Sequence, residues 1–195
     1  MIKSLSKWIA ALALTLPLAG NASILQFDAT LNAANEVINI PPFPNALAAG
    51  IASLFYNTLA NTYNLQLTAS NLSGPITGAH IHAQANPAQI APVIVPLNAV
   101  PFVFLQSGGS LLLIGNNIAA PVGLIGAANS NPAASFLSIL QGGRAYINIH
   151  TGDNPGGEIR GQLFQVAVVP ELEVYAMLLA GLGLIGFTAR RRLRA

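Results

Sequence analysis

The chain has 195 residues, of which 53% are hydrophobic and only 7% are charged, and it contains no cysteine. A disordered protein combines few apolar residues with many charged ones, so the composition excludes that class. Between residues 24 and 169 the chain has two arginines and four acidic residues, which leaves a net charge of −2. Because binding to nucleic acid relies on clustered basic residues, we expect no nucleic-acid partner.

Residues 1–22 have the pattern of a secretory signal peptide. Lys3 and Lys7 give a positive start, residues 8–18 are apolar, and Gly20-Asn21-Ala22 places small residues at a cleavage site. We therefore expect a signal helix that is removed by signal peptidase during export. An exported chain without cysteine has no disulfides, so its stability must come from packing.

Residues 24–165 predict one all-β domain. From Thr62 to Ala69, apolar and polar residues alternate with the period of two that is typical of a half-buried strand. Similar strands are predicted at residues 24–31, 50–56, 77–83, 93–97, 110–114, 144–150 and 158–168. Short strands separated by frequent turns favour an antiparallel β-sandwich or barrel, immunoglobulin-like or superoxide-dismutase-like.

One short helix is predicted before the last strands. Asn131 would cap it, Pro132 would take its first position, and Gly142 would follow its end. Residues 45–50 and 121–131 are rich in alanine, glycine and asparagine, and we expect them to form loops.

Polar side chains gather on three of the predicted strands. By alternation, the isoleucines of each strand face one way and the titratable and amide side chains face the other. If the three strands are neighbours, these polar side chains converge on one outer face of the sheet. They are His80, His82, Tyr146, Asn148, His150, Glu158 and Arg160.

One hypothesis for this face is a metal site. His80 and His82 lie two residues apart on one strand, and His150 comes from another strand. Three imidazoles arranged in this way suit Cu(II) or Zn(II). Copper or zinc is therefore the cofactor that the sequence allows.

The other hypothesis is a structural polar network. Its members would be Glu158, Arg160, Asp153, Tyr146 and Asn148. In that network His80 or His150 would bond to one of the carboxyl groups, and Arg160 would pair with Glu158. The chain has no cysteine nucleophile, no Gly-x-Ser-x-Gly turn and no phosphate loop, so we expect no enzymatic activity.

Residues 169–195 have the pattern of a membrane anchor. Residues 174–188 are uncharged and mostly apolar, and Arg190, Arg191 and Arg192 follow them. A helix of this length spans roughly 22 Å, short for a hydrocarbon core of about 30 Å. We predict a C-terminal transmembrane helix whose arginines stay in the cytoplasm.

The same segment resembles the PEP-CTERM sorting signal. Pro170 and Glu171 precede the apolar helix, and the run Arg190 to Arg192 closes it, although Leu172 stands where that signal most often has a second proline. The resemblance implies processing by an exosortase in a Gram-negative bacterium that makes exopolysaccharide. The protein would be anchored transiently in the inner membrane and then reach the cell surface or extracellular matrix.

The body of the chain resembles the CHRD (chordin-like) domain. The motifs that carry the resemblance are Asn35-Glu36-Val37, residues 71–75, Ala79-His80-Ile81-His82, residues 146–151 and residues 154–163. The resemblance implies a β-sandwich without an enzymatic activity to carry over. We therefore expect an exported β-sandwich with a structural or binding role toward exopolysaccharide or a matrix protein. The alternative is a copper- or zinc-binding module.

Overall fold

The computed structural model describes residues 23–37, 45–167, 178–185 and 190, and its folded part is almost entirely β-structure. The strands are β1 Ile24–Asn32, β2 Ala49–Asn57, β3 Thr62–Ser70, β4 Ile76–Ala83, β5 Val93–Pro96, β6 Val103–Ser107, β7 Ser110–Ala119, β8 Ala145–Thr151, β9 Ile159–Gln162 and β10 Phe164–Gln165. A 3₁₀ turn, η1, spans Ala33–Asn35, and one helix, α1, spans Phe136–Gln141.

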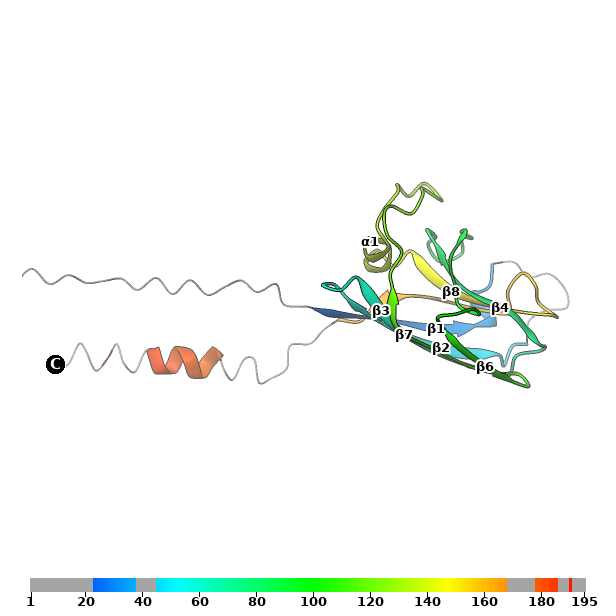
Figure 1. The fold of residues 1–195 in the computed structure, drawn as a ribbon, viewed down its shortest axis with the longest axis horizontal. Helices are drawn as coiled ribbons and strands as arrows, with labels where there is room; N and C mark the ends of the chain where they lie inside the picture. Colours follow the sequence, from blue (N-terminus) through cyan, green and yellow to red (C-terminus); the bar gives the residue numbers. More distant parts are fainter. Residues whose placement is uncertain (1–22, 38–44, 168–177, 186–189, 191–195) are drawn as a thin grey trace, which may run out of the picture.

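The strands form one curled antiparallel sheet in the order β5-β4-β8-β9-β1-β2-β3-β7-β6, with β10 also pairing with β1. Strands β1 and β2 pair over their full lengths, whereas β9 and β1 share a single pair, Asn32 with Arg160. The sheet therefore folds over at this junction. In Figure 1 the layer that contains β4 and β8 faces the layer formed by β1, β2, β3, β7 and β6. The all-β fold and its sandwich-like layering confirm that part of the prediction.

The core fills the space between these two layers. In β3 every second side chain is buried, beginning with Tyr63 at 1% exposure and Leu65 at 0%, as the alternation predicts. On the facing layer, Ile81, Ile147 and Ile149 are fully buried. Burial of this apolar surface supplies most of the free energy that stabilises a chain without disulfides.

Gly161 allows the two layers to meet closely where the sheet folds over. A Cβ atom at this position would lie 2.7 Å from the backbone oxygen of Thr30 and 3.0 Å from the side chain of Leu31. Any side chain at position 161 would therefore push β9 away from β1. Glycine is required here by close approach of two backbones and not by an unusual φ angle.

Most predicted strands match the observed ones within one or two residues. Strand β6 was not predicted, because residues 102–105 are apolar without a period of two. Strand β7 continues to Ala119, five residues beyond its predicted end, and the predicted strand 158–168 is divided into β9 and β10. Residues 49 and 50, expected in a loop, begin β2.

The predicted start of the helix is wrong. Helix α1 begins at Phe136, and Ser135 caps it by accepting a hydrogen bond from the backbone N–H of Ser138. Asn131 instead pairs with Ala128 in a tight turn. Ser135 is as good a cap as Asn131, and Phe136 packs into the core, so burial decides between the two starts. The predicted end at Gly142 is confirmed.

The two terminal predictions lie mostly outside the described residues. Residues 1–22, Pro170, Glu171, Arg191 and Arg192 are among those that the structure does not describe. Within the predicted anchor, residues 178–185 are helical and exposed. No helix in the described part of the chain is both long and apolar enough to cross a membrane.

We predict that Gly161→Ala destabilises the fold, because the added methyl group meets the backbone of Thr30. Overpacking of this kind costs about 1–3 kcal/mol. The midpoint of chemical unfolding measures this loss. Gly126→Ala is the matched control, since a Cβ atom at 126 meets nothing within 4 Å. Equal stability of the two variants would contradict the close passage of β9 and β1.

Candidate metal centre

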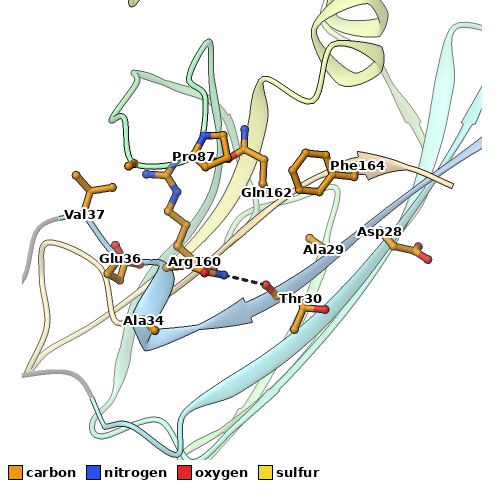
Figure 2. Close-up of a pocket in the computed structure, with 12 residues that line it drawn as sticks. Asp28, Ala29, Thr30, Ala34, Glu36, Val37, Pro87, Arg160, Gln162 and Phe164 are labelled. Carbon is orange, nitrogen blue, oxygen red and sulfur yellow. Dashed lines mark hydrogen bonds between the residues drawn. The ribbon is translucent and has the colours of Figure 1, made fainter.

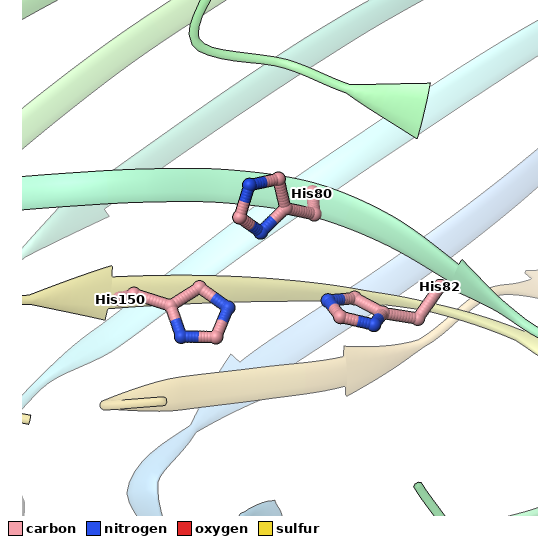
Figure 3. A group of neighbouring side chains, drawn as sticks. All are labelled: His80, His82 and His150. Carbon is pink, nitrogen blue, oxygen red and sulfur yellow. The ribbon is translucent and has the colours of Figure 1, made fainter. Parts of the chain in front are cut away.

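The pairing of β4 with β8 brings all three histidines of the chain together. His80 lies opposite Asn148, His82 opposite Tyr146, and Gly78 opposite His150. Since alternate residues of a strand share a face, the three rings project from the same side of the sheet. Figure 3 shows His80 and His82 on β4 and His150 on the neighbouring β8, with their rings gathered on that side.

The three imidazoles are close enough to hold one ion after a small movement. One ring nitrogen from each lies within 4.8 Å of the other two. The ring centroids of His80 and His150 are 5.1 Å apart, and those of His80 and His82 are 5.6 Å apart. Tetrahedral zinc with Zn–N bonds of 2.0–2.1 Å needs its nitrogens roughly 3.3 Å apart, so shifts of about an ångström close the site.

Backbone carbonyl groups fix the orientation of two of the rings. His82 Nδ1 lies 2.9 Å from the carbonyl oxygen of Ala91, and His150 Nδ1 lies 3.0 Å from that of Pro155. A carbonyl oxygen can only accept, so each Nδ1 carries the proton and each Nε2 presents a lone pair. Metal-bound histidines in proteins are commonly held in this way.

The nitrogens that remain are buried and have no partner. Within the described residues, His80 Nδ1, His82 Nε2 and His150 Nε2 make no hydrogen bond and are shielded from solvent. A buried polar atom without a partner costs free energy, and such atoms are uncommon in folded proteins. Three of them at one point form an arrangement that a bound cation would satisfy.

Burial also keeps the three rings neutral. Desolvation, opposed by the hydrogen bond to Ala91, lowers the pKa of His82 to about 4. Desolvation lowers the pKa of His80, with the neighbouring His150 as a second cause, and desolvation lowers the pKa of His150. At neutral pH all three rings are therefore uncharged, each with one ring nitrogen free of a proton, which is the form that binds metal.

Gly78 makes room for the His80 ring. A Cβ atom at position 78 would lie 2.8 Å from Cε1 of His80 and 3.3 Å from its Nε2. The ring of His80 therefore lies directly over the backbone of residue 78. Sequence patterns did not identify Gly78, because its importance comes from contact with a side chain two residues away.

The predicted outer face is covered, which corrects the expectation that it faces solvent. His82 is 8% exposed, Tyr146 2% and Arg160 3%. Residues 84–92, which we call the cover segment, fold over them. Arg160 Nη1 donates to the carbonyl oxygen of Gln89 at 2.7 Å, and the backbone N–H of Ala91 donates to the hydroxyl of Tyr146. Its residues lack an apolar pattern, so alternation alone could not reveal the cover.

Aromatic and cationic groups stack under this cover. The ring of Tyr146 lies parallel to that of His82, with centroids 4.8 Å apart and an interplanar angle of 5°. The guanidinium carbon of Arg160 lies 3.4 Å from the centroid of Tyr146. A desolvated cation–π contact stabilises by about 2 kcal/mol. The stack covers one face of the His82 ring and so holds this ring in place.

A buried hydrogen-bond network is present, but its pairs differ from the expected ones. Glu158 is fully buried and accepts from the backbone N–H and hydroxyl of Ser73 and from the hydroxyl of Thr151. Neither a histidine nor Arg160 bonds to it. The network fixes the turn at residues 151–158 against the segment before β4, and so it positions the carbonyl group of Pro155.

The remaining members of the predicted network have other surroundings. Asn148 is 5% exposed and lies between His80 and Arg160 across the strands, and its Oδ1 has no partner within the described residues. Asp153 contacts the backbone of the turn at Gly74, where a Cβ atom would lie 3.0 Å from its Oδ2. Neither residue bonds to a histidine.

Glu36 is a buried acid next to this face. Its side chain is 8% exposed, its Oε1 accepts no hydrogen bond from the described residues, and its carboxyl carbon approaches Gly157. Desolvation raises its pKa to about 7, although the nearby Arg160 charge opposes the shift. The sequence motif contained Glu36, but no pattern signalled that it would be buried with one carboxyl oxygen unpartnered.

The comparison with known proteins gives one match. The family model of the CHRD domain matches residues 27–163, which covers more than half of the chain and includes all three histidines. The chain matches no curated protein and no solved structure. Nothing in these comparisons assigns a ligand to the histidine cluster.

We predict that Glu36→Gln stabilises the protein in a pH-dependent way. The folded pKa of about 7 lies above the ordinary glutamate value of 4.5, so ionisation of Glu36 opposes folding as pH rises through this range. Chemical unfolding at pH 5 and pH 8 measures the effect: the variant should gain little at pH 5 and clearly more at pH 8. A gain that does not change with pH would contradict a buried Glu36 whose pKa is raised by desolvation.

Proposed function

Because the chain belongs to the CHRD domain family, we propose that it is an exported β-rich module that binds one copper or zinc ion through His80, His82 and His150. The CHRD domain is typical of extracellular or secreted proteins. The observation that carries the proposal is the meeting of three buried, unpartnered ring nitrogens at one point. A metal ion would give each of them a partner.

Two further features support a metal ion over a purely structural role. In a structural network the histidines would bond to neighbouring polar side chains, yet His82 and His150 bond only to backbone carbonyls, through Nδ1. Those bonds leave Nε2 aimed at the cluster with a lone pair. Imidazole nitrogen is a ligand that suits both zinc and copper.

The donor set implies a site with a free coordination position. Three histidines leave the fourth position of a tetrahedral ion for water or an external ligand. His80 and His150 are partly exposed, so a small molecule could approach from their side. We assign binding to this site and no reaction.

We also propose that terminal signals deliver the module to the cell surface or extracellular matrix. What supports this is the sequence pattern alone: an N-terminal signal peptide and a C-terminal segment that resembles an exosortase substrate. Matrix polymer or a matrix protein would then surround the mature domain. A structural role there is compatible with a bound metal.

We predict that the full chain, purified in detergent and equilibrated with zinc or copper, retains close to one ion per chain. His80→Ala and His150→Ala should each lose that ion, because two imidazoles remain in either variant. Elemental analysis gives the stoichiometry, and thermal unfolding with and without zinc gives an independent readout, since an ion bound only to the folded state raises Tm. Gln66→Ala, on an exposed site of β3, is the control and should behave as wild type.

Gly78→Ala separates the metal site from the fold. The new methyl group displaces the ring of His80, so zinc should bind at least ten-fold more weakly while the apoprotein stays folded. The proposal fails if wild type holds no ion, or if the histidine variants hold as much as wild type.

We predict that Pro170→Ala combined with Glu171→Ala blocks processing in a Gram-negative host that carries an exosortase. Wild type should lose its C-terminal segment and leave the inner membrane, whereas the variant should keep its full mass in that membrane. Mass spectrometry of cell fractions measures both. Glu173→Ala, which lies outside the motif, should mature normally, and equal maturation of all three proteins would contradict the sorting proposal.

A further inference from the structure

A cavity lies near the histidine cluster, and none of the three histidines lines it. Its volume is about 680 Å³, within the range of small-molecule sites, and it lies between β1, β9, η1 and the cover segment. In Figure 2, Phe164 and Asp28 lie at one end of this cavity and Glu36 and Val37 at the other, with Arg160 and Gln162 along one wall.

Apart from the hydroxyl of Thr30, the side-chain donors of the cavity wall are largely engaged by the chain, and Asn35 Nδ2 donates to the carbonyl oxygens of Thr30 and Arg160. Arg160 donates to the carbonyl oxygens of Gln89 and Asn86 and to the side-chain oxygen of Gln162. Gln162 Nε2 in turn donates to the carbonyl oxygens of Ala85 and Gly143. The wall therefore offers a ligand few donors.

The acceptors of the cavity are not engaged to the same degree. Glu36 is more than nine-tenths buried, and its Oε1 has no partner among the described residues. Among the described residues, Asp28 accepts only from Gln26, which leaves part of its carboxylate available to a ligand. A ligand that fits this wall must donate hydrogen bonds at both ends of the cavity.

Charge narrows the class of ligand further. An anion would face two carboxyl groups and find the guanidinium of Arg160 already bonded to the chain. A cation near Glu36 would meet the positive charge of Arg160, which is close enough to act on that carboxyl group. Neutral hydroxyl groups are repelled neither by the two carboxyl groups nor by the charge of Arg160.

Most of the remaining wall is apolar, with Thr30 and Asn35 as its polar members. Ala29, Ala34 and Val37 line the cavity, and the ring of Phe164, which is 55% exposed, closes one end. An exposed aromatic ring combined with carboxylate acceptors can pack against the C–H face of a sugar ring while its hydroxyl groups donate.

We propose that this cavity binds a neutral saccharide, with its hydroxyl groups donating to Glu36 and Asp28 and one sugar ring packed on Phe164. The site would tie the domain to carbohydrate independently of any metal at the histidine cluster. It is distinct in composition from that cluster, because none of the three histidines lines it.

Saturation-transfer NMR on the metal-free full chain in detergent tests the proposal, with glucose, cellobiose and N-acetylglucosamine as probes. At least one of them should bind, and Phe164→Ala and Glu36→Leu should each weaken that binding at least ten-fold. Leu105→Ala is the matched control, because Leu105 is 56% exposed on β6 and lies outside the cavity. EDTA in the buffer keeps the protein metal-free, so the measured saccharide binding does not depend on the metal site.

Three outcomes would overturn the proposal. The first is that none of the three saccharides binds at millimolar concentration. The second is saccharide binding that neither Phe164→Ala nor Glu36→Leu weakens, which would place the sugar elsewhere. The third is that spermidine or acetate, used as a cationic and an anionic probe, binds in the cavity in place of the saccharides. Unfolding curves confirm that both variants are folded before binding is compared.

Discussion

The contact between Arg160 and the carbonyl oxygens of the cover segment is the interaction on which the rest of the polar face depends. Arg160 is 3% exposed, and its guanidinium donates to Gln89 and lies on the ring of Tyr146, which stacks on His82. Burial of this charge is expensive, and it is offset only because carbonyl groups and an aromatic face surround it. Without the cover, His82 would lose the carbonyl of Ala91 and the cluster would open to water.

The same cover divides the face into two environments with different chemistry. On the side of β4 and β8, three neutral imidazoles converge, and their buried, unpartnered nitrogens are the donors that a metal ion takes. On the side of β1 and β9, carboxyl acceptors and an aromatic ring line a cavity whose donors are mostly engaged by the chain. Arg160 belongs to both environments, because it lies on Tyr146 beside His82 and also lines the cavity. The two proposed sites therefore share this residue, but different side chains would bind the metal ion and the saccharide.

Alternation in the sequence was sufficient to predict most of the strands and to place His80, His82 and His150 on one face, because a period of two directly reports which side chains share a side. It could not predict the cover, since residues 84–92 hold the face through backbone carbonyl groups that no side-chain pattern encodes. For the same reason it missed Ala91 and Pro155 as partners of the rings. Pairing of Glu158 with Arg160 was expected from charge, whereas Glu158 accepts hydrogen bonds from Ser73 and Thr151 instead.

The most direct test of the account is a crystal structure of the zinc-loaded protein with anomalous scattering at the zinc edge. The account predicts one strong peak bonded to His80 Nδ1, His82 Nε2 and His150 Nε2 at about 2 Å, with the Nδ1 bonds to Ala91 and Pro155 kept. A peak elsewhere, or no peak while the three rings keep their present positions, would contradict it and leave the histidines as packing residues of the sheet.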